Sequence, residues 1–318
     1  MPRIAFLGTP DVAVPTLERL AESHGVEAVF CNPDRPSGRG RRLEAPPVKQ
    51  SALARELPLF QPESWKAQET RDLWTSLHID LAVVVAYGHL LPRWMLDSCP
   101  LGAWNLHFSL LPRWRGASPV NHALLAGDAE TGVSLMQISP GLDAGPVLAQ
   151  TRRVITLEDT AASLLSELAS DAADLFQTHL PTLISGQGQP TAQDEALATY
   201  APKLHRDMAR LDPARPALEL HRQVRALQPW PGTELSVQGE TLKLHGVGAL
   251  RASLEAPGSL VWNREGAWLT AGDGQALELI QLQRPGKPVQ PALQALQPWG
   301  SHGRTAITET KEARTGEA

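Results

Sequence analysis

Short apolar runs alternate with segments of helical spacing over the first half of the chain. A strand that is covered on both faces reads as a continuous apolar run, so these runs predict buried strands. They lie at 3–8, 26–31, 81–86 and 101–107. Helical spacing between them, as in Val14, Leu17 and Leu20, recurs around 48–56, 66–77 and 117–126. Alternating strands and helices predict an α/β domain with a parallel, doubly wound sheet.

The second half of the chain has a different pattern. Extended segments at 132–138 and 146–156 precede a long helical stretch over about 159–184. A break rich in Gly, Gln and Pro follows, and 216–227 again has helical spacing. Short strand candidates separated by Gly and Pro then lie near 233–238, 241–248, 257–262, 266–271 and 276–282. Many short strands with tight turns predict a small β-barrel.

These breaks in periodicity divide the chain into two domains. We expect an N-terminal α/β domain over 1–188, a linker over 189–205 and a C-terminal β domain over 206–308. Residues 309–318 are polar and small, which is typical of a disordered tail. The length of 318 residues agrees with two domains, each large enough for its own core.

The composition indicates a soluble globular protein. Hydrophobic residues make up 42% and charged residues 20%, and no apolar run approaches the ~20 residues of a membrane span. No signal peptide is visible, and Cys31 and Cys99 are too few for a disulfide framework or a Cys-rich zinc site. We therefore expect a cytoplasmic protein that does not associate with membranes, with a monomer as the default state.

The charges are unevenly placed along the chain. A formal net charge of −5 is unfavourable for a simple nucleic-acid binder. However, 1–202 hold 15 basic and 22 acidic residues, whereas 203–318 hold 14 and 12. Within the acidic half, the segment from Asp34 to Lys49 holds five basic and two acidic residues. Local basic patches of this kind would let a polyanion dock in one orientation, and the alternative is ordinary fluctuation.

Three polar side chains are candidates for catalysis. Asn105 and His107 are two apart at the end of the fourth predicted strand, so they share one face where open parallel sheets bind ligands. An amide and an imidazole there can hold a developing oxyanion and move a proton. Asp143, in the Gly- and Pro-rich loop 140–146, can orient His107 or accept a proton. A satisfied polar pair and an aspartate that caps its own turn remain the alternatives.

The familiar cofactor signatures are absent. Gly8-Thr9-Pro10 lacks the three-glycine dinucleotide pattern, and the sequence has no P-loop, nucleophile elbow or metal-ligand spacing. Arg113, Trp114 and Arg115 mix cations with an aromatic ring, which suits a polyanion, a planar ligand or a solvated turn. The segment 32–47 is longer and richer in Gly and Pro than a loop that only joins two elements. Its arginines could bind phosphates.

A combination of specific motifs runs through most of the chain. In the first domain these are Ile4-Ala-Phe-Leu-Gly-Thr-Pro10, Pro33-Asp-Arg-Pro-Ser-Gly-Arg-Gly40, Val83-Val-Val-Ala-Tyr-Gly88, Leu91-Pro92, Asn105-Leu-His107, Ser109-Leu-Leu-Pro-Arg-Trp-Arg-Gly116, Gly127-Asp-Ala-Glu-Thr-Gly132 and Gly141-Leu-Asp143. Past the predicted linker they continue with Thr199-Tyr-Ala-Pro-Lys-Leu204 and Arg225-Ala-Leu-Gln-Pro-Trp-Pro231. Together they resemble the methionyl-tRNA formyltransferase family over roughly residues 3–300, with departures at Phe108 and Ala144.

The resemblance implies a Rossmann-like formyltransferase fold and an OB-like barrel that contacts tRNA. It implies transfer of a formyl group from 10-formyltetrahydrofolate to the α-amino group of methionyl-initiator tRNA, without a metal. The family's catalytic residues map onto Asn105, His107 and Asp143. Its folate site maps onto Ser109, Leu110, Leu111 and Pro112, with the pterin near Val85, Tyr87, Gly88, Leu91 and Gly141. Its tRNA-binding insertion maps onto 32–47, with Arg35, Arg39, Arg41 and Arg42.

Other acceptors and one non-enzymatic function are alternatives. A formyltransferase that acts on an amino-sugar nucleotide shares the two-domain layout. An enzyme acting on glycinamide ribonucleotide is usually a single shorter domain, and a hydrolase that uses water carries a different regulatory domain. An RNA-binding module on an inactive scaffold would not need all three of Asn105, His107 and Asp143. The basic loop and the positive C-terminal half favour tRNA.

Overall fold

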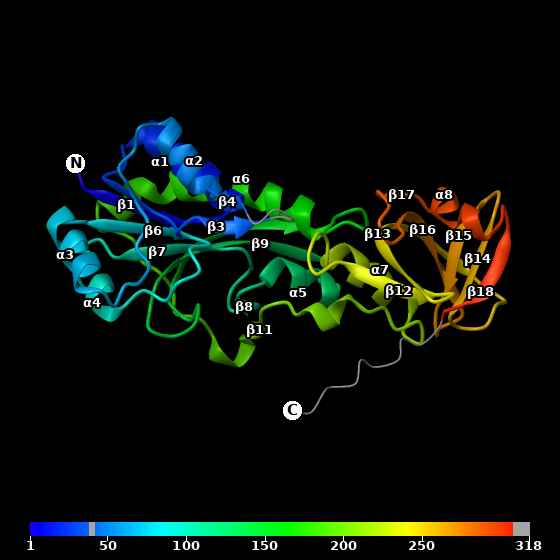
Figure 1. Ribbon diagram of the computed structural model, residues 1–318. Coiled ribbons are helices and arrows are strands. Elements are labelled where there is room, and N and C mark those ends of the chain that lie inside the picture. Colours follow the sequence, from blue (N-terminus) through cyan, green and yellow to red (C-terminus); the bar gives the residue numbers. More distant parts are fainter. Residues whose placement is uncertain (38–41, 308–318) are drawn as a thin grey trace, which may run out of the picture. The chain divides into compact units, whose positions relative to one another are not determined.

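The computed structural model describes residues 1–37 and 42–307, which form two compact units (Figure 1). Unit 1 comprises Met1–Val120, Ala129–Ile155 and Ser163–Pro202. Unit 2 comprises Asn121–Asp128, Thr156–Ala162 and the chain from Lys203 onward. The segment predicted as a linker is therefore divided, since 189–202 pack within unit 1. The predicted tail over 309–318 lies outside the described residues.

Unit 1 is built on a seven-stranded sheet in the order β10-β9-β7-β6-β1-β2-β5. Five of its strands are parallel, which confirms the predicted parallel α/β sheet. They are β1 (Ile4–Gly8), β2 (Ala28–Phe30), β5 (Leu59–Phe60), β6 (Leu81–Val85) and β7 (Ala103–His107). The two extended segments foreseen in the second half add antiparallel strands, β9 (Glu130–Gln137) and β10 (Val147–Val154), at one edge.

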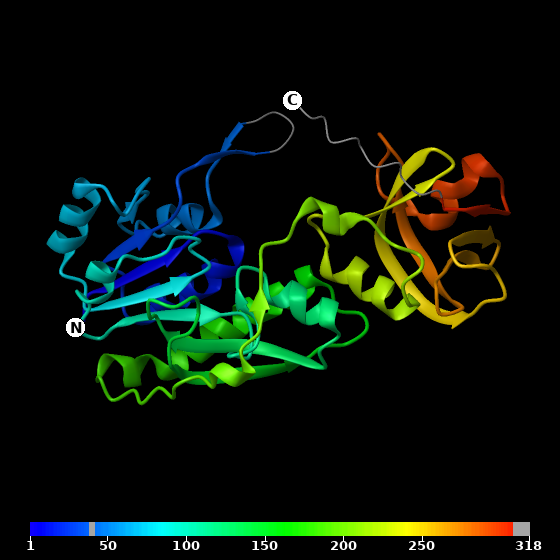
Figure 2. The same cartoon turned by 90° about the horizontal axis from the view of Figure 1, so that it is seen from below.

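The predicted helices of the first half are present, and short elements join them. The predicted helices are α1 (Val14–Ser23), α2 (Pro47–Ala54), α3 (Gln68–Leu77) and α5 (Pro119–Ala126), and the long predicted helix is α6 (Ala161–Ile184). A short helix that was not predicted, α4 (Arg93–Leu96), lies between β6 and β7. Two short strands, β3 (Arg35–Ser37) and β4 (Arg42–Glu44), pair as a hairpin that extends away from the sheet (Figure 2). Another two, β8 (Arg115–Gly116) and β11 (Tyr200–Ala201), pair in parallel. Strands this short carry no periodicity, so the sequence pattern did not predict them.

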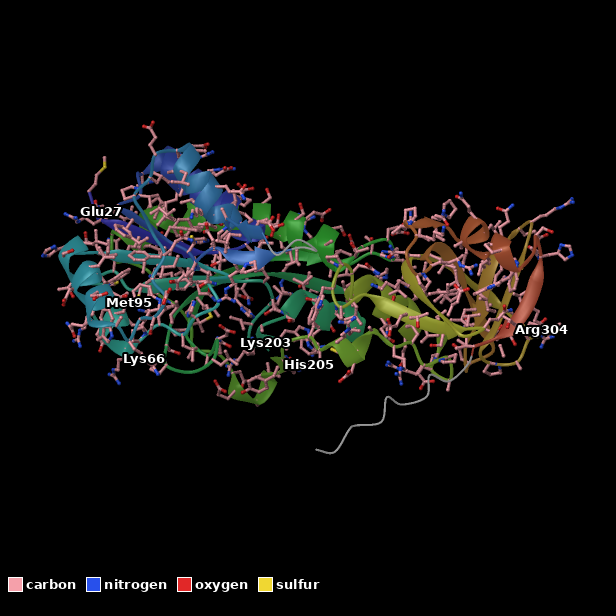
Figure 3. The ribbon with its side chains drawn as sticks, viewed as in Figure 1. Glu27, Lys66, Met95, Lys203, His205 and Arg304 are labelled. Carbon is pink, nitrogen blue, oxygen red and sulfur yellow. The ribbon has the colours of Figure 1, made fainter. Side chains whose placement is uncertain are left out.

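An aromatic cluster forms the core on one side of this sheet. The rings of Phe30 and Trp74 lie 5.4 Å apart, and Trp65 lies 6.2 Å from Tyr87. Met95 of α4 is fully buried in the same cluster, whereas Lys66 is exposed (Figure 3). Tilted and edge-on aromatic pairs at these separations join the end of β2, helix α3 and the loop that follows β6 in one core.

Unit 2 contains a curled antiparallel half-barrel of the OB-like kind (Figure 1). Its main strand order is β12-β13-β16-β15-β14-β18, and β17 pairs with β16. A bridge between Val237 and Ile307 joins the first strand to the end of the last. The strands are β12 (Thr233–Val237), β13 (Glu240–Ala252), β14 (Ser259–Asn263), β15 (Gly266–Thr270), β16 (Gln275–Gln283), β17 (Gln290–Pro291) and β18 (Gly303–Ala306).

Two helices accompany this half-barrel, α7 (Ala217–Ala226) and α8 (Ala292–Leu296). Leu220 and Val224 of α7 and Leu296 of α8 join the buried side chains of the strands in one core. The predicted helix at 216–227 and the predicted small barrel are thereby confirmed. Across residues 1–37 and 42–307, no helix has the length and apolarity required to cross a membrane.

Candidate active site

Asn105 and His107 lie on one face at the carboxyl end of β7. The strand runs between β6 and β9, and Asn105 pairs with Val84 on one side and Met136 on the other. His107 is only 6% exposed, and Asn105 is half-buried. Within the described residues, the side-chain amide of Asn105 makes no hydrogen bond. A half-buried amide without a partner is a donor available to a ligand.

The two ring nitrogens of His107 face different acceptors. Nε2 lies 2.9 Å from the carbonyl oxygen of Trp114. Because a carbonyl oxygen only accepts, Nε2 carries a proton and donates it. Nδ1 lies 3.7 Å from Oδ2 of Asp143, which is within ion-pair range but too long for a hydrogen bond. Nδ1 is therefore the nitrogen that can serve a reacting group.

Asp143 lies in the loop between β9 and β10, and its backbone is left-handed at φ 46°. Its Oδ2 accepts a hydrogen bond of 2.8 Å from the backbone N–H of Gly116, which is distant in sequence. An aspartate that merely caps its own turn would bond to a neighbouring N–H instead. The loop thus brings a carboxylate to the Nδ1 side of His107.

The expected folate segment is a tightly bonded loop. The hydroxyl of Ser109 donates to the carbonyl of Arg113 at 2.7 Å, so this side chain is turned into its own loop. The N–H of Leu111 donates to Ser134 Oγ at 3.1 Å, and the amide of Gln150 donates to the Leu111 carbonyl at 2.9 Å. Leu110 is half-buried, as is Pro112. The segment therefore offers a pre-formed surface beside His107.

The residues expected near the pterin follow β6 or lie in the Asp143 loop. Val85 ends β6 and is fully buried. Tyr87 is also buried, where its hydroxyl accepts from Trp65 Nε1 at 3.1 Å and burial raises its pKa to about 12. Its ring therefore belongs to the core, and only its backbone borders the loop. Gly88 and Gly141 are exposed, and Leu91 packs partly against the core.

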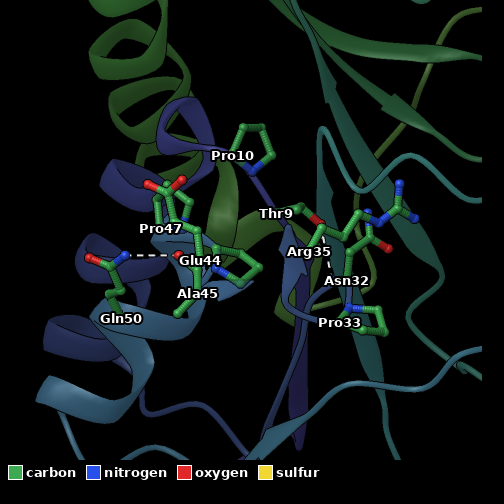
Figure 4. Close-up of a pocket in the computed structure, with 10 residues that line it drawn as sticks. Thr9, Pro10, Asn32, Pro33, Arg35, Glu44, Ala45, Pro47 and Gln50 are labelled. Atoms are coloured by element: carbon green, nitrogen blue, oxygen red, sulfur yellow. Dashed lines mark hydrogen bonds between the residues drawn. The ribbon is translucent and has the colours of Figure 1, made fainter. Parts of the chain in front are cut away.

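A pocket of about 320 Å³ lies where β1 and β2 end and the β3–β4 hairpin begins (Figure 4). Its lining is mostly apolar, with four prolines and Ala45, and its polar residues are Thr9, Asn32, Arg35, Glu44 and Gln50. The N–H of Asn32 donates to Thr9 Oγ1 at 3.3 Å, and its side chain donates to the Tyr87 carbonyl at 3.2 Å. These bonds connect the pocket wall to the loop after β6.

The four arginines expected to bind tRNA belong to this hairpin segment. Arg35 begins β3, is exposed and lines the pocket (Figure 4). Arg42 begins β4. Arg39 and Arg41 lie outside the described residues.

Arg115 does not serve as a polyanion contact. It is 2% exposed, and its guanidinium makes two hydrogen bonds to Glu195, at 2.9 and 2.8 Å. The hydrogen bonds that Arg115 donates to Glu195 raise the pKa of Arg115 and lower the pKa of Glu195. Gln193 and Thr199 also reach this loop, and the sequence analysis missed them because they fall in the predicted linker. The signal for Thr199 was the Thr199-Tyr-Ala-Pro-Lys-Leu204 motif, which does not include Gln193.

The arrangement suits the attack of an amine on a carbonyl group. It offers an amide donor, the Nδ1 atom of an imidazole and a carboxylate around one strand end, and such groups can stabilise an oxyanion and accept a proton. In the part of the chain that the structure describes, no three His, Cys, Asp or Glu side chains gather as a metal site would require.

Comparisons with known proteins identify the relatives of the chain. Residues 2–180 match the family described as formyl transferase, and 203–298 match its C-terminal domain. The methionyl-tRNA formyltransferase of Xanthomonas axonopodis pv. citri is 47% identical over 288 residues, covering 89% of this chain and 93% of that protein. The methionyl-tRNA formyltransferase of Methylococcus capsulatus is 45% identical over 287 residues, covering 90% and 93%.

A solved structure supports the fold. The N-formyltransferase from Helicobacter canadensis, in complex with folinic acid and dTDP-3-aminofucose, aligns with a TM-score of 0.67 at 19% identity. The alignment covers 89% of this chain and all of that one. This likeness confirms the formyltransferase fold predicted from the sequence motifs.

Proposed function

The chain belongs to the methionyl-tRNA formyltransferase family, and on this premise we propose how its residues carry out the reaction. The protein formylates methionyl-tRNA, and enzymes of its family take the formyl group from a folate derivative. We propose that the donor is 10-formyltetrahydrofolate. The acceptor is the α-amino group of methionine on initiator tRNA, and the product is N-formylmethionyl-tRNA for translation initiation.

Asn105 and His107 stabilise the charge that develops on the formyl oxygen. The neutral amine attacks the formyl carbon, and the carbonyl π electrons move to oxygen to give a tetrahedral oxyanion. The free amide of Asn105 and the Nδ1–H of a doubly protonated His107 donate hydrogen bonds to this oxyanion. Nε2 stays bonded to the Trp114 carbonyl, which keeps the ring in place. Preorganised donors of this kind contribute on the order of 10²–10³ each in rate.

Asp143 serves as the proton acceptor and as the partner of the imidazolium. The new ammonium group loses a proton to Asp143, directly or through water. The oxyanion then re-forms the carbonyl as the bond between the formyl carbon and the donor nitrogen breaks. The proton held by Asp143 passes, directly or through water, to that nitrogen, which leaves as tetrahydrofolate. The observation that carries the proposal is the position of the Asp143 carboxylate, 3.7 Å from Nδ1 of His107 at a strand end.

The two substrates approach this site from different loops. We assign the folate donor to Ser109–Pro112, the loop from Val85 to Leu91 and Gly141. The tRNA acceptor end is assigned to the β3–β4 hairpin, because Arg35 and an apolar pocket lie together there. Unit 2, which is richer in basic than acidic residues from 203 onward, supplies further tRNA contacts. The protein acts in the cytoplasm as a monomer, since its acceptor is a charged tRNA and one chain supplies Asn105, His107 and Asp143.

A formyl-transfer assay with charged initiator tRNA and 10-formyltetrahydrofolate tests the proposal. We expect the wild type to form N-formylmethionyl-tRNA, and His107→Ala and Asp143→Asn to lower kcat by on the order of 10²-fold or more. An exposed histidine variant, His302→Asn, is the control. Full activity of His107→Ala would contradict the assigned roles.

The alternative acceptor, an amino-sugar nucleotide, is tested by running the same formyl-transfer assay with that nucleotide in place of tRNA. The likeness to the Helicobacter canadensis enzyme is at 19% identity, far below the 45–47% to the methionyl-tRNA formyltransferases. Donor consumption with an amino-sugar nucleotide and none with tRNA would overturn the tRNA acceptor but not the catalytic residues.

A further inference from the structure

One glutamine side chain is bonded to the loop that carries Asp143. The amide group of Gln193 donates to the carbonyl of Asp143 at 2.8 Å and to that of Gly145 at 2.7 Å. Its oxygen accepts from Arg115 Nε at 3.0 Å. Both amide hydrogens and the oxygen are thus engaged, and two of the three bonds go to the main chain of the Asp143 loop.

A threonine from the same segment is bonded to the loop on the other side of His107. Thr199 Oγ1 accepts from the N–H of Trp114 at 2.9 Å, and the Thr199 carbonyl accepts from the N–H of Arg115 at 2.8 Å. The carbonyl of Trp114 is in turn the acceptor for Nε2 of His107. Thr199 therefore holds both peptide units that flank the Trp114 Cα, and the unit that contains the Trp114 carbonyl also holds the histidine ring.

Both residues that flank the histidine ring have strained backbones. Trp114 has a φ of 64° and Asp143 a φ of 46°, and residues other than glycine rarely adopt such positive values. Such conformations cost on the order of 1–2 kcal/mol each and persist where surrounding contacts over-determine them. Gln193 and Thr199 provide contacts of this kind, one at each strained residue.

We propose that Gln193 and Thr199 are positioning residues, which set the separation and orientation of the His107–Asp143 pair for formyl transfer. The inference rests on the proposed function of that pair. Neither residue acts on the reacting atoms. Gln193 acts through the main chain of Asp143, and Thr199 acts through Trp114. A displacement of about 1 Å at a catalytic group can cost on the order of 10² in rate, so the loss of either contact should mainly affect kcat.

The test compares four variants with a matched control. Gln193→Leu removes the amide at similar volume, and Gln193→Glu keeps an acceptor for Arg115 but removes the donors to the two carbonyls. Thr199→Val removes the hydroxyl, and Thr199→Ser restores it. Gln177→Leu is the control, since Gln177 is also half-buried in unit 1 but bonds to Ser23 on the surface.

We expect a fall in kcat with little change in substrate affinity. Gln193→Leu, Gln193→Glu and Thr199→Val should lower kcat by on the order of 10- to 100-fold, with KM for both substrates within about twofold of the wild type. The pH dependence of kcat should change, because the Nδ1–Oδ2 separation sets the mutual stabilisation of the two groups. Thr199→Ser and Gln177→Leu should behave as the wild type.

A spectroscopic measurement makes the test independent of the acceptor. In protein labelled with ¹⁵N-histidine, the ring signals of His107, assigned with His107→Ala, should shift and titrate differently in Gln193→Leu but not in Gln177→Leu. Unchanged kcat, pH profile and ring signals in Gln193→Leu and Thr199→Val would overturn the proposal. The proposal would also be overturned if the activity of these variants fell only in proportion to the fraction of folded protein. A wild type that is inactive on methionyl-tRNA would contradict the proposed function instead, and the ring signals would still decide this inference.

Discussion

His107 and His221 are buried to the same extent, but their neighbours differ in charge. Each is 6% exposed. His107 lies at ion-pair distance from the Asp143 carboxylate and donates a hydrogen bond to the Trp114 carbonyl. His221 lies on α7, where its Nδ1 accepts from Arg225 Nε at 3.1 Å. Burial, followed by the charges of Arg225 and Arg222, lowers the pKa of His221 to about 4. It is therefore a neutral acceptor that anchors an arginine.

This difference predicts an acid sensitivity for unit 2. His221 has an ordinary pKa of 6.5 when unfolded and about 4 when folded, so the unfolded chain binds more protons between these values. Its contribution to stability is present above pH 6.5 and is lost as the pH falls towards 4. Between pH 7 and 5, the free energy of unfolding should fall by about 2 kcal/mol because of His221.

The variant His221→Asn cannot titrate and should remove that part of the pH dependence. Urea unfolding of the full chain at pH 7 and pH 5 measures it, with the exposed His302→Asn as the control. Equal acid destabilisation in His221→Asn and the wild type would show that other groups cause it.

The two-residue strands β8 and β11 bring the predicted linker segment to the loop that follows His107. Gly116 of β8 has a φ of 121°, and a Cβ at this position would lie 2.6 Å from the carbonyl oxygen of Ala201 in β11. The backbones can approach this closely only because Gly116 has no side chain. The N–H of the same residue is the donor to Asp143 Oδ2. A single glycine thus connects the strand pair to the Asp143 carboxylate.

Gly116→Ala should therefore affect both stability and catalysis. Gly25→Ala is a suitable control, because Gly25 also has a positive φ, 79°, but has no atom within 4 Å of a Cβ. The control should lose about 1–2 kcal/mol of stability from backbone strain and keep its kcat. Gly116→Ala should lose more, with kcat reduced by on the order of 10-fold or more as Asp143 shifts.

Thermal unfolding and steady-state kinetics measure the two effects of Gly116→Ala. If this variant and Gly25→Ala proved indistinguishable in both measurements, the close approach at β8 would have no role in the site.

The whole molecule is negatively charged, yet its acceptor is a polyanion. The net charge of −5 repels phosphates at long range, so binding must depend on local clusters. The segment from Asp34 to Lys49 is such a cluster in sequence. Arg35, near the start of this segment, lines the pocket. The segment from 203 to 318 carries a small excess of basic residues. We expect phosphate contacts to concentrate in these two regions.

Neutralising Arg39, Arg41 and Arg42 together should weaken tRNA binding and leave donor binding nearly unchanged. Three lost phosphate contacts should reduce the slope of log Kd against log salt by about 2–3. The measurement is a tRNA titration at several salt concentrations. A triple variant at the exposed Arg55, Lys66 and Arg93 removes the same charge elsewhere in unit 1. Equal losses in both variants would contradict a specific role of the hairpin segment.

The sequence by itself determined the long elements, the fold class and the family. A buried strand or helix face shows in the spacing of its own apolar residues. The apolar run at 81–86 and the helical spacing at 159–184 were therefore sufficient to predict β6 and α6. Asn105, His107 and Asp143 were also found in sequence, because two of them share a strand end and the motifs resemble a family. Their catalytic roles stay predictions.

Only the tertiary structure decided how the segments around these residues meet. The antiparallel direction of β9 and β10, the burial of Arg115, and the bonds of Gln193 and Thr199 to the catalytic loops all join residues distant in the chain. Pairs such as β8 and β11, with two residues each, have no periodicity to read. Such contacts depend on which backbone groups face each other after folding, and a local pattern of hydrophobic and polar residues does not record that.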